Sequence, residues 1–454
     1  MGGAKIGLIF AHRPPTEATW PRIGYDYDKR SEEVLKVLRA HLPGVEFMVF
    51  RASSPEEGRK IVEETRKDVD GYVVYILGIW TAVPKVIAYS GKPTILIDDL
   101  FGGSGEFLIA MAEARRANLP VVGVSSSDIR DVVETVKLLK VIHQLKGSKI
   151  IVIRDPELKV KSYDPTRSVE RGHFSEQYLR TCKEVFGVDI LTITPEKLRE
   201  TYDGISAESA EEYAKKWTSN ALRVVEVSEE EVLKSAKLYL ALKRLADEHK
   251  ALAVSVDCLT LFYVGKLPAY PCLSHMQMLD EGRVGTCEAD MDSAISQLVA
   301  YYLTGRPAFI SDPVIDESTG TIVYAHCVAP TRVWGPQGGV IPYIIKTHAE
   351  DGKGASVQAI YPVGETVTTF KINVKERAIA IHTGKIVGNL EEDEKGCRTK
   401  VVVKTNVEAI LNNWNRVVNF DWHRVTVIGD YRKSLKRLAV LLGLKVIEED
   451  RDED

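Results

Sequence analysis

Four side chains in the C-terminal half of the chain are of the types needed for metal and acid–base chemistry: Glu288, Asp312, His326 and His423. Two carboxylates and one or two imidazoles, with further positions left for substrate hydroxyls, would bind a divalent metal such as Mn²⁺. Oxygen-rich ligation of this kind, without thiolates, argues against a structural zinc site. The four residues therefore form a candidate metal centre, provided that the fold brings them together.

Each of these residues also has an ordinary structural explanation, which the sequence leaves open. Acidic residues at a helix start complement the helix dipole, and an aspartate followed by Pro313 can cap a turn. A single histidine is more often a hydrogen-bonded structural residue than a metal ligand. Cys287 and Cys327 adjoin the candidates, and we interpret both as packing residues.

The first of the four residues lies beside a predicted helix. Apolar residues between positions 294 and 302 recur at helical spacing, and Gly305 ends the pattern. Glu288 therefore lies at or just before the start of this helix.

The other three candidates lie at the ends of β-like segments. The run 308–310 predicts a strand that stops at Asp312, where Pro313 breaks it. His326 ends the next β segment, and His423 directly precedes another. In α/β domains, helix starts and strand ends can face a shared crevice, so this placement favours a common site.

The first third of the chain alternates between strand-like and helix-like segments. Strands are expected at residues 6–10, 46–50, 71–79, 93–97 and 121–124, and helices at 31–41, 55–67, 105–117 and 128–145. This alternation predicts a parallel sheet with helices on both faces. A second unit of the same kind begins near Lys149, with further strands at 188–192 and 252–256 and a long helix after Ser228.

Beyond Arg306 the pattern changes to β segments separated by glycine or charged turns, at residues 321–325, 366–373, 377–382 and 399–404. We therefore predict an α/β fold of two N-terminal doubly wound α/β domains followed by a β-rich, antiparallel, barrel-like C-terminal domain. The expected domains are residues 1–147, 148–304 and 305–454. A mobile loop is expected at 163–172, and the acidic tail 448–454 is expected to fray.

Composition excludes several classes of function. The 454 residues carry a formal net charge of −4, so no basic field indicates nucleic acid or an anionic membrane as partner. The longest apolar runs are too short for a membrane span, and the N-terminus shows no targeting segment, so we expect a cytoplasmic location. The six cysteines form no Cys-x-x-Cys pair, which fits reduced thiols.

Two more residues are candidate substrate contacts. Arg13 follows the first predicted strand and could reach a substrate hydroxyl or carboxylate, although a surface loop explains it equally well. His348 could contact substrate or could simply belong to the loop beside Asp351.

Several motifs occur in the order found in the L-fucose isomerase and L-arabinose isomerase superfamily, which the chain resembles from about Val254 to its end. The motifs are Cys287-Glu288-Ala289-Asp290, Leu303-Thr304-Gly305-Arg306-Pro307, Asp312, Ala325-His326-Cys327, Gly396-Cys397-Arg398-Thr399 and His423-Arg424-Val425. The first half is similar only in its α/β alternation and in Arg13-Pro14 after the first strand.

This resemblance implies an aldose–ketose isomerase, an intramolecular oxidoreductase that acts on a free sugar through an ene-diol intermediate. In that family two acids and a histidine hold Mn²⁺, or another divalent metal, and the acids shuttle protons. The matching positions are Glu288 and Asp312, as ligands and catalytic residues, and His423 as the third ligand. His326 resembles the additional histidine of the arabinose branch.

The resemblance also implies further contacts and an assembly. The family forms trimers or hexamers in which a neighbour's N-terminal domain closes the site, so we expect a homotrimer or homohexamer. The expected substrate-binding residues are Arg13, His326, His348 and Trp422.

Two alternatives remain open at this point. One is a carbohydrate-active enzyme of another reaction, a glycosidase or an epimerase, on the same scaffold. A glycosidase would need its two acids about 5–10 Å apart and no metal. The other alternative is a non-catalytic sugar-binding protein, which would need aromatic and amide contacts but no metal ligands.

Overall fold

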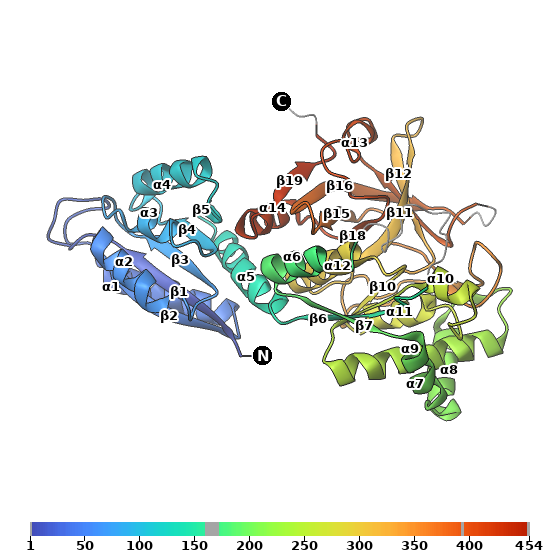
Figure 1. The fold of residues 1–454 in the computed structure, drawn as a ribbon. Helices are drawn as coiled ribbons and strands as arrows, with labels where there is room; N and C mark the ends of the chain where they lie inside the picture. Colours follow the sequence, from blue (N-terminus) through green and yellow to red (C-terminus); the bar gives the residue numbers. More distant parts are fainter. Residues whose placement is uncertain (1, 159–171, 392–394, 452–454) are drawn as a thin grey trace. The chain divides into compact units, whose positions relative to one another are not determined.

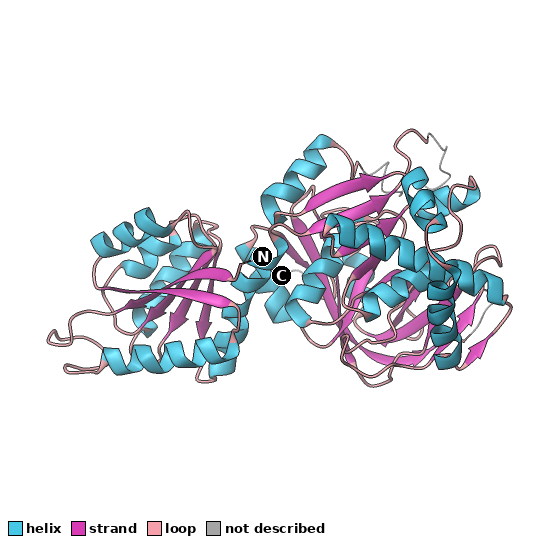
Figure 2. Ribbon diagram, turned by 90° about the horizontal axis from the view of Figure 1, so that it is seen from below, coloured by secondary structure: helices cyan, strands magenta, loops and turns pink. Residues whose placement is uncertain are grey.

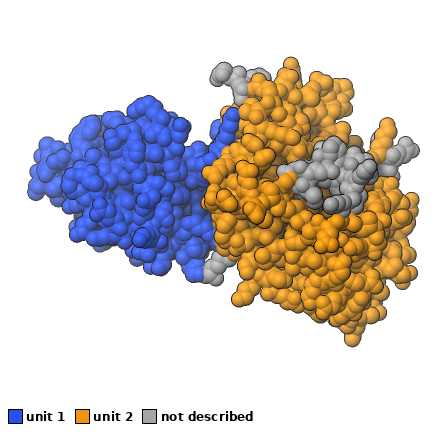
Figure 3. Space-filling model, viewed as in Figure 1, with its two compact units in different colours: residues 1–146, 433–445 blue, residues 147–432, 446–454 orange. Residues whose placement is uncertain are grey.

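The computed structural model describes residues 2–158, 172–391 and 395–451, and Figure 1 shows the course of the chain. Residues 163–171 of the predicted mobile loop lie outside the described residues. The chain divides into two compact units, coloured separately in Figure 3: unit 1 is residues 1–146 with 433–445, and unit 2 is residues 147–432 with 446–454. In the described ranges, no helix combines the length and the apolar character needed to cross a membrane.

Unit 1 is built on a parallel sheet whose five described strands have the order β2-β1-β3-β4-β5. The strands are β1 (Ala4–Ala11), β2 (Val45–Ala52), β3 (Gly71–Ile76), β4 (Thr94–Asp98) and β5 (Val121–Ser125). The helices are α1 (Tyr27–His41), α2 (Pro55–Thr65), α3 (Val83–Ala88), α4 (Ser104–Arg116), α5 (Ile129–Leu145) and, near the C-terminus, α14 (Arg432–Leu441). Helices cover both faces of this sheet in Figure 2, which confirms the predicted doubly wound arrangement.

The sheet of unit 1 is held by burial on both of its faces. Every residue of β3 is buried, as expected for a central parallel strand. Val74 of β3 and Leu96 of β4 share one apolar cluster with Phe107 and Met111 of α4. Each fully buried side chain of this size contributes about 1.5–3 kcal/mol, so the cluster fixes the helix on the sheet.

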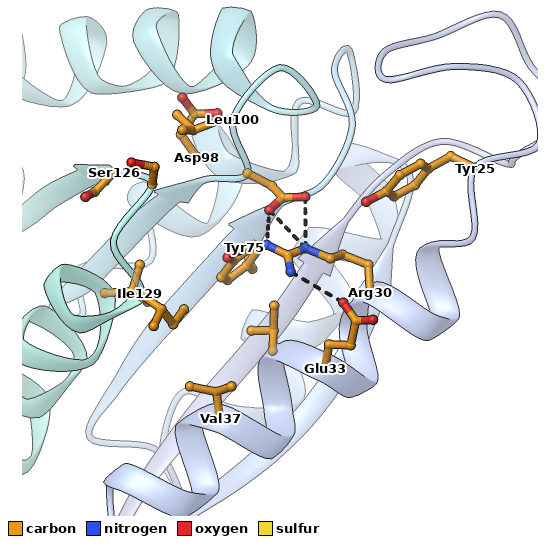
Figure 4. Close-up of a pocket in the computed structure, with 13 residues that line it drawn as sticks. Tyr25, Arg30, Glu33, Val37, Tyr75, Asp98, Leu100, Ser126 and Ile129 are labelled. Atoms are coloured by element: carbon orange, nitrogen blue, oxygen red, sulfur yellow. Dashed lines mark hydrogen bonds and ion pairs between the residues drawn. The ribbon is translucent and has the colours of Figure 1, made fainter.

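A hollow of about 660 Å³ lies at the carboxyl ends of β3 and β4, where ligands of open α/β sheets usually bind. Figure 4 shows Arg30 reaching from α1 into this hollow. Its guanidinium lies 2.6 Å from Asp99 and 3.5 Å from Glu33. Asp98 also lines the hollow, so acidic side chains outnumber the single arginine.

Unit 2 begins with a second parallel sheet, whose described strands have the order β10-β9-β6-β7. These are β6 (Lys149–Ile153), β7 (Asp189–Ile193), β9 (Ala253–Val256) and β10 (Val284–Thr286). The helices of unit 2 are α6 (Glu176–Phe186), α7 (Pro195–Asp203), α8 (Ala207–Asn220), α9 (Glu229–His249), α10 (Cys258–Tyr263), α11 (Cys272–Asp280), α12 (Met291–Thr304) and α13 (Val407–Asn413). Ser228 caps α9 by accepting a hydrogen bond from the amide of Glu231, as its position predicts.

An antiparallel barrel follows in the same unit. Its strands are β11 (Phe309–Asp316), β12 (Thr321–His326), β15 (Thr366–Asn373), β16 (Ala378–Asn389), β17 (Thr399–Lys404) and β18 (Arg424–Ile428). They pair in the order β15-β18-β11-β12-β17-β16, the pairing of β15 with β16 closes the ring, and β19 (Lys445–Glu448) adds to β16. A small sheet contains β8 (Arg223–Val224), β13 (Tyr343–Lys346) and β14 (Ser356–Ala359). The barrel confirms the predicted C-terminal architecture.

The prediction that Pro313 ends its strand is wrong, because β11 continues to Asp316. The indole of Trp422 donates a hydrogen bond to the carbonyl of Pro313 at 2.9 Å. In a strand, the nitrogen and carbonyl of one residue point to the same side, so the proline nitrogen also faces away from β12. Pairing with β18 stops at Ser311, so the missing N–H removes no ladder hydrogen bond.

The predicted fraying of the acidic tail is also wrong for the described residues up to 451. Glu449 is fully buried, and its carboxylate accepts hydrogen bonds from Arg424 at 2.7 Å and His382 at 2.8 Å. Its amide donates to the carbonyl of Ile381 at 2.9 Å. One carboxylate of the acidic tail is thus held inside the barrel wall by hydrogen bonds from Arg424 and His382.

Candidate metal centre

Three strands and one turn bring the four candidate side chains together. β11 lies between β12 and β18, and Asp312 pairs with Ala325 while Ser311 pairs with Arg424. This register places His326, the last residue of β12, and His423, which precedes β18, on either side of Asp312. Glu288 arrives from the turn between β10 and α12.

The ligand atoms of these residues lie close to one another. Nε2 of His423 is 3.2 Å from Oδ1 of Asp312 and 3.7 Å from Oε2 of Glu288. Nε2 of His326 is 3.8 Å from Oε1 of Glu288. Asp312, His326 and His423 each offer one ligand atom within 4.8 Å of the other two. Both histidines are buried, whereas the Glu288 side chain is 31% exposed and forms the open edge of the cluster.

The charges in the cluster favour a cation between the carboxylates. Burial alone would lower the pKa of His423, but the carboxylates of Asp312 and Glu288 outweigh it and raise the pKa to about 10. Burial would raise the pKa of Asp312, but the attraction of His423 lowers it. The centre therefore stabilises positive charge at the position where a divalent metal would bind.

A second carboxylate orients His423 from behind. Nδ1 of His423 lies 3.0 Å from Oδ2 of Asp290, which is 1% exposed. Nζ of Lys371 lies 2.5 Å from the same oxygen and also donates to Ser293 at 2.5 Å. An imidazole that donates from Nδ1 to a carboxylate presents its Nε2 lone pair on the other side, as in metal-binding histidines. Nε2 of His423 therefore faces Asp312 and Glu288, where a bound metal would take the place of its proton.

Asp290 also caps the helix that follows the turn carrying Glu288. Its Oδ1 accepts a hydrogen bond from the amide of Ser293 at 3.0 Å and so caps the N-terminus of α12. Glu288 and Ala289 both adopt the left-handed region, with φ of 59° and 51°. This conformation costs an L-residue energy of about 1–3 kcal/mol and is concentrated at functional sites. The amide of Ala289 donates to the carbonyl of Val256 at 3.1 Å, which ties the turn to the end of β9.

Two other predicted substrate contacts, Trp422 and Arg13, interact with protein groups in this structure. Trp422 is half exposed beside His423 and bonds to Pro313, next to Asp312. Arg13 belongs to unit 1, where its guanidinium pairs with Glu17 at 2.5 Å.

His348 is buried and follows β13, a strand of the small sheet, by two residues. Its ring stacks on Tyr270 with centroids 4.3 Å apart. Burial lowers its pKa, but the neighbouring sulfur of Cys327 outweighs this and raises the pKa to about 9. These contacts tie His348 to the residue after His326 and give it structural partners.

The sequence does not single out Asp290 and Lys371, although both contact the machinery of the centre. Asp290 stands inside the quoted motif that begins at Cys287, and its helix-capping position gave it an ordinary explanation. Lys371 is a lysine between Phe370 and Ile372 in a β-rich run and is fully buried. A charged residue in an apolar strand is the one signal that could have indicated a buried partner.

Comparison with known proteins gives a sugar isomerase as the recurrent similarity. No family model matches the chain. A sulfoquinovose isomerase of Clostridium sp. (strain MSTE9) is 29% identical over 187 residues, which are 38% of this chain and 39% of that protein. The sulfoquinovose isomerase of Alkalicoccus urumqiensis is 23% identical over 295 residues, 61% of this chain and 62% of that protein. That of Priestia megaterium (strain ATCC 12872 / QMB1551) is 26% identical over 227 residues, 48% of each chain. The chain thus matches about 39 to 62% of the length of these relatives.

Proposed function

We propose that this protein is a metal-dependent aldose–ketose isomerase that acts on a free sugar through an ene-diol intermediate. The observation that carries the proposal is that Nε2 of His423 faces the carboxylates of Glu288 and Asp312 while Asp290 holds Nδ1. The similarity to sulfoquinovose isomerases supports sugar isomerisation as the reaction.

Glu288, Asp312 and His423 would hold the metal. Their donor set of two carboxylates and one imidazole suits Mn²⁺ or another divalent cation with preference for oxygen and nitrogen. The charges fit as well, because both acids stabilise a cation at Nε2 of His423. When bound, such a cation would supply Lewis acidity that polarises the sugar carbonyl and acidifies the adjacent C–H.

Glu288 and Asp312 are the residues that can move protons. An ene-diol route needs a base that removes a proton from one carbon and an acid that delivers it to the neighbouring carbon. The lowered pKa of Asp312 keeps this carboxylate ionised near neutral pH. Glu288 forms the exposed edge of the cluster, where a substrate entering from solvent would reach it.

The sugar itself is a separate question from the reaction. The relatives are named for sulfoquinovose, whose sulfonate gives it a negative charge, whereas the motif resemblance points to the neutral sugars L-fucose and L-arabinose. We propose a monosaccharide substrate and take these three sugars as the first candidates.

The experiment is an isomerisation assay on purified protein with a panel of aldoses and ketoses that includes the three candidates. The protein is stripped with a chelator, its metal content is measured, and Mn²⁺ is then added back. We expect the stripped protein to be inactive and Mn²⁺ to restore ketose formation. Undiminished turnover in a preparation verified as metal-free would contradict the proposal, and so would hydrolysis of glycosides as the main reaction.

A further inference from the structure

The two histidines of the centre present opposite hydrogen-bonding faces. Nδ1 of His326 accepts a hydrogen bond from the backbone N–H of Val328 at 3.2 Å. A ring nitrogen that accepts a hydrogen bond carries no proton, so the neutral imidazole of His326 has its proton on Nε2. His423 has the reverse arrangement, because its Nδ1 donates to the carboxylate of Asp290 and its Nε2 is the nitrogen that a metal would bind.

The N–H of His326 points into the cluster without an acceptor. His326 is 3% exposed, and within the described ranges its Nε2 has no hydrogen-bond partner. The Oε1 of Glu288, at 3.8 Å, is too distant for a hydrogen bond. A buried donor left without an acceptor costs about 1–3 kcal/mol, and such a group in a native protein needs an explanation. An oxygen atom of a ligand between His326 and Glu288 would supply the missing acceptor.

We propose that His326 is a neutral hydrogen-bond donor to a reacting oxygen of the substrate and is not one of the metal ligands. The role of the oxygen rests on the proposed isomerase function, whereas the tautomer of His326 rests only on its bond to Val328. Three ligands, Glu288, Asp312 and His423, are then left for the metal.

This role has a clear chemical purpose. Negative charge develops on the carbonyl oxygen as the ene-diol forms, and a donor placed at that oxygen stabilises the charge. A neutral imidazole fulfils this task in triosephosphate isomerase, another aldose–ketose isomerase. His326 keeps its proton throughout, because one carboxylate of the pair Glu288 and Asp312 takes the proton from one carbon and returns it to the neighbouring carbon, while the other moves the hydroxyl proton to the former carbonyl oxygen.

The tautomer can be measured without turnover. The protein is labelled with ¹⁵N-histidine, and the ring signals of His326 are assigned by their loss in His326→Gln. We expect Nε2 to carry the proton both before and after addition of Mg²⁺, a diamagnetic ion, while Nε2 of His423 shifts on metal binding. A proton on Nδ1 of His326, or a metal-induced shift of its Nε2, would overturn the proposal.

Two substitutions of similar size separate a donor from a ligand. His326→Gln keeps an N–H near the position of Nε2, and His326→Met removes it. Both variants should retain as much metal as the wild type, in contrast to His423→Ala. His326→Met should lower kcat by about 10²–10³-fold, as does removal of one oxyanion donor elsewhere, and His326→Gln should recover at least tenfold of that loss.

The outcomes keep this proposal distinct from the isomerase assignment. Loss of metal from both His326 variants, with circular dichroism unchanged, would make His326 a ligand, and wild-type kcat in His326→Met would remove its catalytic role. Either result contradicts the inference. If the wild type bound metal but isomerised no sugar, the proposed function would fail, and the ¹⁵N spectra would still decide the tautomer. His249→Gln, at the end of α9, is the control for the loss of an imidazole.

Discussion

Oδ2 of Asp290 accepts from Nδ1 of His423 at 3.0 Å and lies 2.5 Å from the ammonium of Lys371. All three side chains are buried, and the lysine neutralises a carboxylate that would otherwise be costly inside the protein. The relationship connects the start of α12 with two neighbouring barrel strands, β15, which carries Lys371, and β18, which His423 precedes. It makes Asp290 a positioning residue, because it acts on the metal only through His423.

The first prediction concerns Asp290→Asn. An amide in this position holds the imidazole less firmly and raises its basicity less, so we expect about 10–100-fold weaker metal binding. It also replaces the carboxylate that lies 2.5 Å from the buried ammonium of Lys371 by a neutral amide, which should cost about 3–5 kcal/mol of stability. Metal affinity is measured by calorimetry and stability by urea denaturation.

The double variant Asp290→Asn, Lys371→Met is the matched control for the charge effect. It removes both charges, so stability should return toward that of the wild type while the metal affinity stays low. Wild-type affinity in either variant would show that Asp290 does not position His423.

The sequence predicted the helix and strands that carry the site better than the contacts between side chains that support it. Helical periodicity and Gly305 located α12, and β alternation located the barrel, because both patterns reflect which faces are buried. Whether Asp290 caps a helix or also holds His423 depends on a contact across 133 positions of sequence, which local pattern does not encode. Pro313 and Glu449 were misjudged for the same reason. The structure of Pro313 depends on which side of its strand is paired, and that of Glu449 depends on Arg424, which lies far away in the sequence inside the barrel wall.

The second prediction concerns the two acids. Glu288→Gln and Asp312→Asn keep the side-chain volume but remove a charge and a proton acceptor, so each should lower kcat by about 10²–10⁴-fold. His423→Ala should instead lose bound metal, which elemental analysis detects. Circular dichroism should match the wild type in all three. A variant of either acid with wild-type turnover would show that the residue is not the base.

The third prediction is acid sensitivity at Glu449. Burial alone would raise the pKa of this carboxyl, but the charge of Arg424 and the hydrogen bond from His382 lower it to about 2, from 4.5 in the unfolded chain. A carboxyl whose pKa falls on folding stabilises the protein fully above pH 4.5, and this stability is lost as the pH falls toward 2. Urea midpoints measured across this window should therefore decline toward low pH.

Glu449→Gln tests the origin of that decline. It should lower stability at neutral pH by about 3–5 kcal/mol, because the buried Arg424 loses its partner, and it should flatten the dependence between pH 4.5 and 2. Glu376→Gln, on an exposed turn, is the control and should change neither property. An unchanged pH profile in Glu449→Gln would assign the acid sensitivity to other carboxyls.

The fourth prediction concerns assembly. We expect a homotrimer or homohexamer in which a neighbour's unit 1, with Arg13, completes each site. Arg13→Ala and Glu288→Gln should each be nearly inactive alone, and co-expressed subunits should regain activity, because mixed oligomers contain intact sites. Arg59→Ala, which removes a surface ion pair with Glu56 in the same unit, is the control. A fully active monomer in light scattering at assay concentration would contradict the prediction.

The last prediction separates proton transfer from hydride transfer between C1 and C2. A hydride shift needs no carboxylate base at carbon, whereas an ene-diol route needs one within about 3 Å of the C–H. Glu288 and Asp312 face the same imidazole nitrogen from a turn and from a strand, so a sugar held there would have a carboxylate beside its reacting carbons.

A carboxyl group that has taken the proton can exchange it with water before returning it, and the Glu288 side chain is partly exposed. Reaction in D₂O should therefore place deuterium at C2 of the aldose or C1 of the ketose, which NMR detects. Glu288→Gln should slow turnover and deuterium incorporation together. Complete retention of substrate hydrogen, combined with activity in the Glu288→Gln, Asp312→Asn double variant, would rule out the carboxylate mechanism.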